Sequence, residues 1–436
     1  MGSTTTSHHV DVAIIGGGIT GLTLALGLQA RNVRFTVYER APSLKEIGAG
    51  VGFSPNAERA MELLNPDVHA AFKAVANANG EDYFQWVDGY ATGQLIYKLY
   101  VGEGKFQGCR RSDFVEGLAR KIPNDSIKYG KEVIEIRTGD DGRPIVVFKD
   151  GEEIVADIVI GADGIRSITR QQLLGPTNPA SHPSYTHRCC FRALVPIPLA
   201  SDAITLAGGD GAYSTSTRFM YNGPDGHIIT YPVAGDTLLN ILVVMTDYCD
   251  WKAKDGKMTA RTTKAEAVEF FRDWKHPAVK AMVNELLPEV LDKWGVFDMM
   301  KDPAERYNEG CVVLAGDAAH AAGPHLGGGA GMGIEDALVL ATALEAVDGK
   351  AEGEEKVRLC ERALETYNQV RYERTQWLIK ATREACALFH LKPPEVPNKQ
   401  HNEMFGKEVS ERFHTIWDGD VEGMVESTRK LLEAGQ

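Results

Sequence analysis

The sequence of 436 residues predicts an α/β fold in which a nucleotide-binding domain is interrupted by an antiparallel β-sheet and followed by a helical C-terminal region. Three stretches support this prediction. Residues 10–41 read as strand, glycine-rich turn, helix and strand. Residues 188–246 have the texture of short strands and turns, whereas the chain from Gly333 onward reads mainly as helix.

The first stretch is VDVAIIGGGITGLTLALGLQARNVRFTVYERA, and it carries G-x-G-x-x-G spacing at Gly16, Gly18 and Gly21. Gly16 allows a tight turn, Gly18 lets a pyrophosphate approach the backbone, and Gly21 lets the helix pack closely on the strand. Glu39 ends the second strand, where its carboxylate can accept hydrogen bonds from ribose hydroxyls. The pattern predicts a Rossmann-like dinucleotide-binding unit and leaves NAD and FAD open.

The middle of the chain predicts the inserted sheet. RFMYNGPDGHIITYPV reads as a hairpin with its turn at 222–226, and residues 264–287 read as helix. A late apolar strand at 311–315 is expected to complete the nucleotide-binding sheet. The expected division is a nucleotide-binding domain in residues 1–80, 105–180 and 296–345, a β-sheet substrate domain in 81–104 and 181–295, and a helical region in 346–436, broken at 392–397.

Two further motifs follow buried strands. DIVIGADGIRS ends its strand with the turn at Asp163 and Gly164. CVVLAGDAAHAAGPHLGGGAGMGIEDALVLATAL ends its strand at Asp317 and continues into a loop with six glycines between 323 and 333. That many glycines are entropically costly for packing alone, and they suit a backbone that lies flat against a planar ligand. Asp317 could accept hydrogen bonds from a sugar-like chain, and the start of the late helix would place positive partial charge near an electron-rich ring.

Composition excludes several functions. The net charge is −13 without a basic block, which argues against a nucleic-acid surface. The seven cysteines are scattered and contain no C-x-x-C, which favours a reducing, cytoplasmic compartment. The longest apolar stretch, at 19–28, is too short to span a bilayer.

The three motifs in this order and spacing resemble the class A flavoprotein monooxygenases. EIGAGVGFSPNAERAMELL, EDYFQWVDGY, CRRSDFVEGLAR and AGDAAHAAGPHLGGGAG resemble the salicylate-hydroxylase-like branch, nearest to fungal enzymes that hydroxylate, and often dearomatise, polyketide phenols on azaphilone, tropolone and sorbicillinoid routes. The resemblance implies bound FAD, NADH or NADPH as a transient co-substrate, O2, and a flavin C4a-hydroperoxide that delivers oxygen to a phenolic, polyketide-derived ring.

The resemblance also assigns cofactor contacts to individual residues. They are Glu39 for the adenosine ribose, Gly52 for a backbone contact with the flavin, Arg111 for the ribityl or pyrophosphate region, Asp163 for cofactor or nicotinamide traffic, Asp317 for the ribityl hydroxyls and Ala330 for the flavin pyrimidine edge. The family's usual His before the arginine is Arg110 here, so only Arg111 is carried over.

Arg192, in RCCFRALVPI, matches the family's substrate-facing arginine. A cation near a phenol oxygen lowers the pKa of the phenol and orients the ring, and arginine presents fixed donors to an oxyanion. A tyrosine partner is expected in the same branch. Tyr221 and Tyr231 lie on the two arms of the hairpin, and Tyr221 is chosen although the strand register is not fixed by the sequence.

Other polar residues of the late motif receive structural roles. His320 is expected to be a structural hydrogen-bonding residue, and the Glu335-Asp336 pair is expected to cap the late helix. His320 and His325 do not have the spacing of a metal site with any carboxylate, so no metal is predicted.

Two alternatives stay open, an FAD oxidase or reductase without oxygen insertion and a non-catalytic flavin-binding protein. A flavin-dependent halogenase usually carries W-x-W-x-I-P, and no W-x-W occurs here. The sequence does not specify the phenol, the carbon attacked, retention of aromaticity, NADH or NADPH, or the oligomeric state.

Overall fold

The computed structural model describes residues 8–44, 50–252, 256–391 and 398–434. A six-stranded sheet in the order β18-β19-β11-β1-β2-β7 forms the nucleotide-binding part. Its strands in that order are Asn308–Glu309, Val312–Leu314, Ile158–Gly161, Asp11–Ile15, Arg34–Glu39 and Ile127–Tyr129. The four strands from β19 to β2 are parallel, so their carboxyl ends meet at one edge, where ligands bind in such sheets.

Helices cover one face of this sheet and a small sheet covers the other. The helical side holds α1 (Ile19–Ala30), α2 (Pro55–Leu64), α3 (Pro66–Lys73), α4 (Arg111–Ala119) and α11 (Gly329–Val347). The opposite face packs against the antiparallel strands β8 (Val133–Thr138), β9 (Pro144–Phe148) and β10 (Glu153–Val155). The α1 helix is buried almost all round, which explains its continuous apolar sequence.

The second large sheet has eight strands in the order β16-β17-β12-β15-β14-β13-β4-β5. They are Thr259–Thr263, Val290–Asp298, Ser184–Pro196, Leu238–Thr246, Gly226–Val233, Phe219–Gly223, Tyr83–Asp88 and Leu95–Tyr100. The expected hairpin is β13–β14, in which Gly223 pairs with Gly226 across the turn. The predicted α/β fold with an inserted, mainly antiparallel sheet is confirmed.

Helices cover the outer face of the eight-stranded sheet, and the sequence predicted only some of them. These helices are α6 (Ile197–Leu206), α7 (Gly211–Ser216), α8 (Ala265–Phe270) and α9 (Pro277–Ala281). The first two lie in a region expected to hold only strands and turns. The single helix expected at 264–287 is divided because α8 ends at Phe270 and Pro277 begins α9, followed by a π-helical turn at Met282–Leu286.

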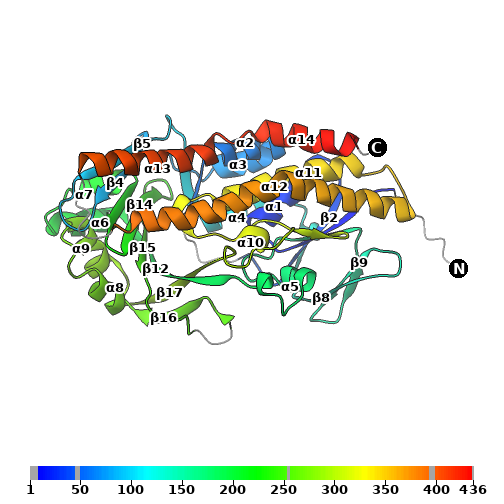
Figure 1. Cartoon of the computed structure of the whole chain (residues 1–436), viewed down its shortest axis with the longest axis horizontal. Coiled ribbons are helices and arrows are strands. Elements are labelled where there is room, and N and C mark those ends of the chain that lie inside the picture. Colours follow the sequence, from blue (N-terminus) through cyan, green and yellow to red (C-terminus); the bar gives the residue numbers. More distant parts are fainter. Residues whose placement is uncertain (1–7, 45–49, 253–255, 392–397, 435–436) are drawn as a thin grey trace.

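The C-terminal helices connect the two parts of the molecule (Figure 1). They are α12 (Gly353–Phe389), α13 (Lys399–Trp417) and α14 (Val421–Glu433). The first half of α12 packs in the nucleotide-binding core through Leu364 and Tyr367, and its second half packs on the eight-stranded sheet through Ala385 and Phe389. The expected break at 392–397 lies outside the described residues.

Short elements complete the frame between the two sheets. The antiparallel pair β3 (Gly50–Phe53) and β6 (Gln107–Arg110) lies beside β14. Two short helices, α5 (Ile168–Leu174) and α10 (Asp317–His320), follow the second and third motifs. Single 3-10 turns occur at Asn124–Ser126, Pro179–Ser181 and Pro324–Leu326.

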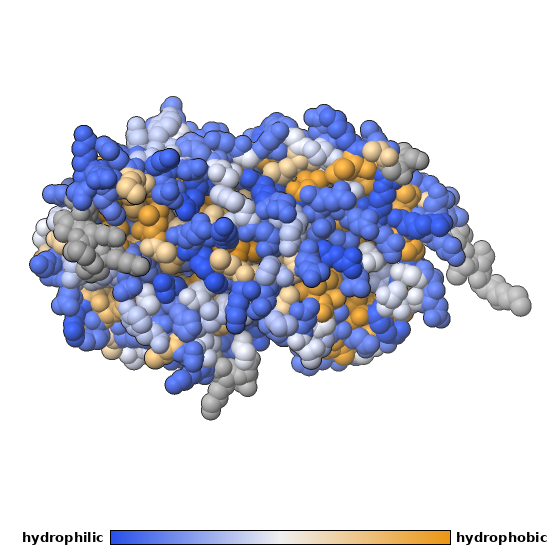
Figure 2. Space-filling view, viewed as in Figure 1, coloured by the Kyte–Doolittle hydropathy of each residue, from blue (hydrophilic) through white to orange (hydrophobic). Residues whose placement is uncertain are grey.

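The surface and the cysteines agree with the composition. In Figure 2 hydrophilic side chains cover most of one face, and the apolar ones form separate small patches. Among the described helices, none has an apolar stretch of the length needed to cross a membrane. All seven cysteines are free thiols, and every one except Cys249 is buried.

Candidate active site

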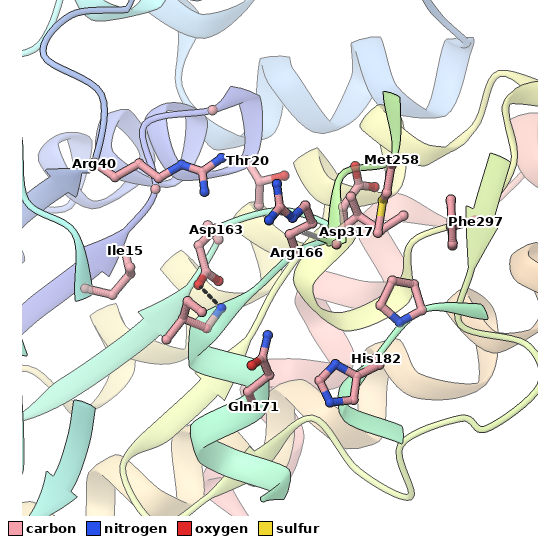
Figure 3. A pocket seen from close by; sticks show the side chains of 18 of the residues that line it. Ile15, Thr20, Arg40, Asp163, Arg166, Gln171, His182, Met258, Phe297 and Asp317 are labelled. Atoms are coloured by element: carbon pink, nitrogen blue, oxygen red, sulfur yellow. Dashed lines mark hydrogen bonds between the residues drawn. The ribbon is translucent and has the colours of Figure 1, made fainter. Parts of the chain in front are cut away.

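A cavity of about 940 Å3 lies where the three sequence motifs meet (Figure 3). Most of the predicted cofactor residues line it, namely Gly16, Gly18, Glu39, Arg111, Asp163, Asp317 and Ala330. Gly21 and Gly52 are not among the lining residues. Segments that are hundreds of residues apart in the sequence therefore form one site, which a single elongated ligand could span.

The first glycines are required by close backbone contacts. Gly16 has φ +110, and a Cβ atom there would lie 2.4 Å from the carbonyl oxygen of Ala162. A Cβ atom at Gly21 would lie 2.0 Å from the carbonyl oxygen of Gly16, so only glycine lets α1 pack this closely on the turn. Gly18 caps α1 without a side-chain hydrogen bond, which leaves the helix start to a ligand in the cavity.

Glu39 lies at the end of β2 and is held by the backbone on both carboxylate oxygens. Its Oε2 atom accepts from the amide of Gly17 at 2.7 Å, and Oε1 accepts from the amide of Ala41 at 2.8 Å. A carboxylate oxygen can accept more than one hydrogen bond, so the fixed group keeps capacity for ribose hydroxyls.

Asp163 holds its own turn. Its carboxylate accepts hydrogen bonds from Ser167 Oγ at 2.5 Å and from the amides of Ile168 and Thr169 at 2.8 and 3.0 Å. Burial raises the pKa of this carboxyl, and these hydrogen bonds act in the opposite direction. Asp163 lines the cavity, but its hydrogen bonds are those of a cap on the start of α5.

Asp317 differs because its carboxylate makes no hydrogen bond to any residue that the structure describes. The side chain is open to the cavity, while the surrounding protein raises its pKa by desolvation and the charges of His320 and Arg111 oppose that rise. Arg111 Nη2 lies 3.8 Å from the position of a Cβ on Gly18, so this guanidinium stands beside the α1 start. An acceptor with free oxygens next to a cationic cradle suits a chain of hydroxyls joined to a pyrophosphate.

An ionic network, buried except for the partly exposed Arg374, supports the loop that carries Asp317. Asp336 accepts from His320 Nε2 at 2.5 Å, from Arg371 Nε at 2.8 Å and from the Gly316 amide at 2.9 Å. Glu335 pairs with Arg371 at 2.6 Å and with Arg374 at 2.9 Å. Burial alone would raise the pKa of both carboxyls, but the neighbouring cations outweigh it and both pKa values are lowered.

This network corrects one expectation and confirms another. Glu335 and Asp336 do not cap α11, because its N-cap is Gly328 and both carboxylates lie within the helix and face its interior partners. The structural hydrogen-bonding role of His320 is confirmed by its contact with Asp336. Sequence periodicity gave no signal for Arg371 and Arg374 as their partners.

The inner face of the eight-stranded sheet looks toward the glycine-rich loop, because Leu326 and Met332 pack with Met220 and Ile229. The strand register sets Arg192 opposite Leu242, and Leu242 opposite Ile229. These cross-strand partners share a face. Arg192 is exposed, and its Cζ atom lies 5.0 Å from the ring centre of Trp294.

Tyr231 lies on this inner face and Tyr221 does not. Tyr231 packs against the cluster that contains Met220 and Ile229. It lies opposite Asn240, whose Oδ1 accepts a hydrogen bond from the Gly50 amide of β3 at 3.1 Å. Tyr221 is 1% exposed and packs in the core between the sheet and the helices α6, α8 and α9. The structure therefore does not bring Tyr221 to Arg192, and Tyr231 replaces it as the candidate substrate partner below.

Gly52 and several residues without a motif occupy the space between β3 and this face. A Cβ atom on Gly52 would lie 3.0 Å from Phe106 and 3.9 Å from Arg218 Nη2. The sequence did not predict a role for Arg218, because neither its spacing nor its neighbouring residues form a motif. Its location is set by the hairpin together with β3 and β6.

Three buried side chains, His227, His325 and Cys386, have ligand atoms within 4.8 Å of one another. This arrangement was not predicted, since the three come from distant segments. Arg188 lies beside this cluster. Burial and the positive charge of Arg188 both lower the pKa of His325, whereas burial raises the pKa of the Cys386 thiol and the charge of Arg188 opposes that rise. The same charge opposes a metal cation there.

Comparisons with known proteins agree with the site. A family model described as FAD binding domain matches residues 9–382. The FAD-dependent monooxygenase pigN of Monascus ruber is 44% identical over 99% of this chain and 100% of that protein. The salicylate hydroxylase asL1 of Sarocladium schorii is 35% identical over 98% of this chain and 92% of that protein. A solved salicylate hydroxylase substrate complex superposes with a TM-score of 0.82 at 29% identity, covering 97% of this chain and 98% of that one.

Proposed function

This chain belongs to the FAD-binding domain family and is an FAD-dependent monooxygenase, and we propose that its substrate is a small phenolic compound with a polyketide-derived ring. NADH or NADPH serves as the reductant, as is usual for this class. The observation that carries the substrate proposal is that Arg192 and Tyr231 share the inner sheet face, on which Met220 and Ile229 pack with Leu326 and Met332 of the glycine-rich loop.

The residues of the cavity fit FAD. Glu39 would hold the adenosine ribose, the α1 start with Arg111 would hold the pyrophosphate, and Asp317 would bind the ribityl hydroxyls. Ala330, in the first turn of α11, would meet the pyrimidine edge of the ring, where the helix dipole favours negative charge. The bound flavin supplies the activation of O2, which amino-acid side chains do not provide.

The sheet would hold and polarise the phenol. Arg192 offers a fixed cation to the phenol oxygen, which favours the phenolate and so enriches the ring in electrons for attack by an electrophilic oxygen. Tyr231 offers a hydroxyl that makes no hydrogen bond to a described residue. Burial raises its pKa to about 12, and the charges of Arg218 and Arg192 oppose that rise, so Tyr231 acts as a neutral donor at neutral pH.

The test uses purified protein with FAD and a panel of small phenols. We expect a yellow protein whose NAD(P)H oxidation is faster with a phenol, and one atom of oxygen-18 from labelled O2 in the product. Faster NAD(P)H oxidation without label in the product would favour an oxidase or reductase. Ligand binding without stimulated turnover would indicate a flavin-binding protein instead. Product mass and NMR then determine whether the ring keeps its aromaticity.

A further inference from the structure

Arg218 is a buried arginine immediately before β13, on the same sheet face as Tyr231. Its side chain is 3% exposed, and its Cζ atom lies 4.2 Å from the ring centre of Phe106 and 5.2 Å from that of Tyr231. The two aromatic rings hold the guanidinium by cation–π contact. Such contacts fix the orientation of the group but leave its N–H donors without acceptors.

Among the residues that the structure describes, none accepts a hydrogen bond from Arg218. Its Nε and Nη1 atoms are buried without a hydrogen bond, and no carboxylate among the described residues forms an ion pair with it. Burial lowers its pKa to about 10, so the group remains charged at neutral pH. Burying an unpaired cation is costly, and proteins normally provide an acceptor.

The other two buried arginines show that normal pattern. Arg170 donates to the carbonyl oxygens of Ala180, Ala318 and Ala319. Arg371 pairs with Glu335 and Asp336. Among the buried arginines in the described part of the chain, Arg218 alone lacks any acceptor.

The Nη2 end of the Arg218 guanidinium lies beside the strand pair β3–β6. Its Nη2 atom is 3.2 Å from the position of a Cβ on Gly108 and 3.9 Å from that of a Cβ on Gly52. These two glycines face each other in the β3–β6 pair, and Gly52 is the residue expected at the flavin. Because both positions are glycine, the guanidinium can lie close against this strand pair.

We propose that Arg218 binds an anionic oxygen on the aromatic substrate, so that the substrate site holds two arginines, Arg192 and Arg218. The ligand chemistry is a ring that carries a phenolate or a carboxylate, the phenolate being favoured by a carbonyl group on the same ring. This inference rests on the proposed function, because it adds a second recognition point to the same site. The buried cation is balanced only when the substrate is bound.

The test measures binding to the FAD-loaded enzyme through the change in flavin absorbance. The probes are 2,4-dihydroxybenzaldehyde, 2,4-dihydroxybenzoate and the neutral 2,4-dimethoxybenzaldehyde. Arg218→Met removes the charge at similar volume, Arg218→Lys keeps it, and Arg261→Met changes an exposed arginine that pairs with Asp292. We expect Arg218→Met to weaken the binding of one or both hydroxylated probes at least tenfold and that of the dimethoxy probe less than twofold. Arg218→Lys should give intermediate affinities, and Arg261→Met should bind all three probes as the wild type does. The hydroxylated probe that loses more affinity identifies phenolate or carboxylate as the anion.

Thermal unfolding of the same variants separates this role from a structural one. Since Arg218→Met removes an unpaired buried charge, we expect the midpoint without aromatic ligand to stay the same or rise, while the ligand-induced increase is reduced. A lower midpoint together with unchanged probe affinities would overturn the inference and leave the phenol proposal standing. If the wild-type holoenzyme binds and hydroxylates no phenol, the proposed function fails and this inference falls with it.

Discussion

Arg371 Nε lies 2.8 Å from Oδ1 of Asp336, and neither side chain is exposed to solvent. The pair joins the middle of α12 to the helix that follows the glycine-rich loop. Because Arg371 also contacts Glu335, it compensates two buried carboxylates at once.

Removing this arginine should strongly destabilise the fold. Arg371→Met leaves two buried carboxylates short of a cation, and we expect a loss of about 3–5 kcal/mol in the free energy of unfolding. Arg358→Met changes an exposed arginine on the same helix and should stay within about 0.5 kcal/mol. Urea unfolding of the two variants checks this, and equal losses would contradict it.

The same network predicts a loss of stability in acid. The pKa of Asp336 in the folded protein is lowered below its unfolded value of about 3.9 because the effects of His320 and Arg371 outweigh burial. Its contribution is therefore complete well above pH 4 and is lost as the pH falls through the folded pKa. We expect Asp336→Asn to be less stable at pH 7 and to lose less on going from pH 7 to pH 3 than the wild type. Asp202→Asn, at an exposed position, should follow the wild-type pH curve, and the prediction fails if Asp336→Asn does too.

Cofactor binding should depend on the close contact of Gly21 with the turn. Gly21→Ala places a Cβ 2.0 Å from a backbone oxygen, so the turn must shift and we expect most of the bound flavin to be lost. Gly117→Ala is the matched control, because its Cβ would meet Ala71 at an ordinary 3.6 Å within α4. That change should keep the flavin and raise stability by about 0.5–1 kcal/mol. The ratio of flavin to protein absorbance after gel filtration measures the difference. Full flavin content in Gly21→Ala would show that cofactor binding does not depend on this contact.

The two hairpin tyrosines should differ in their effect on turnover. Tyr231→Phe removes a donor on the inner face, and we expect kcat/KM for the best phenol to fall about tenfold or more. Tyr221→Phe alters a side chain in the outer core and should change kcat/KM less than twofold once the protein is folded. Initial rates of substrate-dependent NAD(P)H oxidation and of product formation give the comparison. The reverse ranking would restore Tyr221 as the substrate partner.

The sequence predicted the features that depend on local backbone geometry. Gly16, Gly18 and Glu39 were found because a βαβ unit requires them at fixed spacing, and the structure places all three around one cavity. Asp317 was predicted because it follows a buried strand of the same parallel sheet, β19, which ends at Leu314.

The remaining site residues depend on tertiary packing. Tyr221 was preferred to Tyr231 because alternation along a strand says nothing about which face is inward until neighbouring strands are placed. The burial of Arg218 could not be predicted from the sequence, because it arises from packing between Phe106 and Tyr231 in the folded protein. The sequence did not predict the helices α6 and α7, because the segments on either side of them have the composition of strands and turns.

The helix α12 has 37 residues, which makes it about 55 Å long, and it is packed into both halves of the molecule. This helix opposes a hinge motion that separates the two halves, because such a motion would have to bend the helix or detach it from one half. Entry of a reductant and exit of an oxygenated product must then rely on movements of individual loops or of the coenzyme itself.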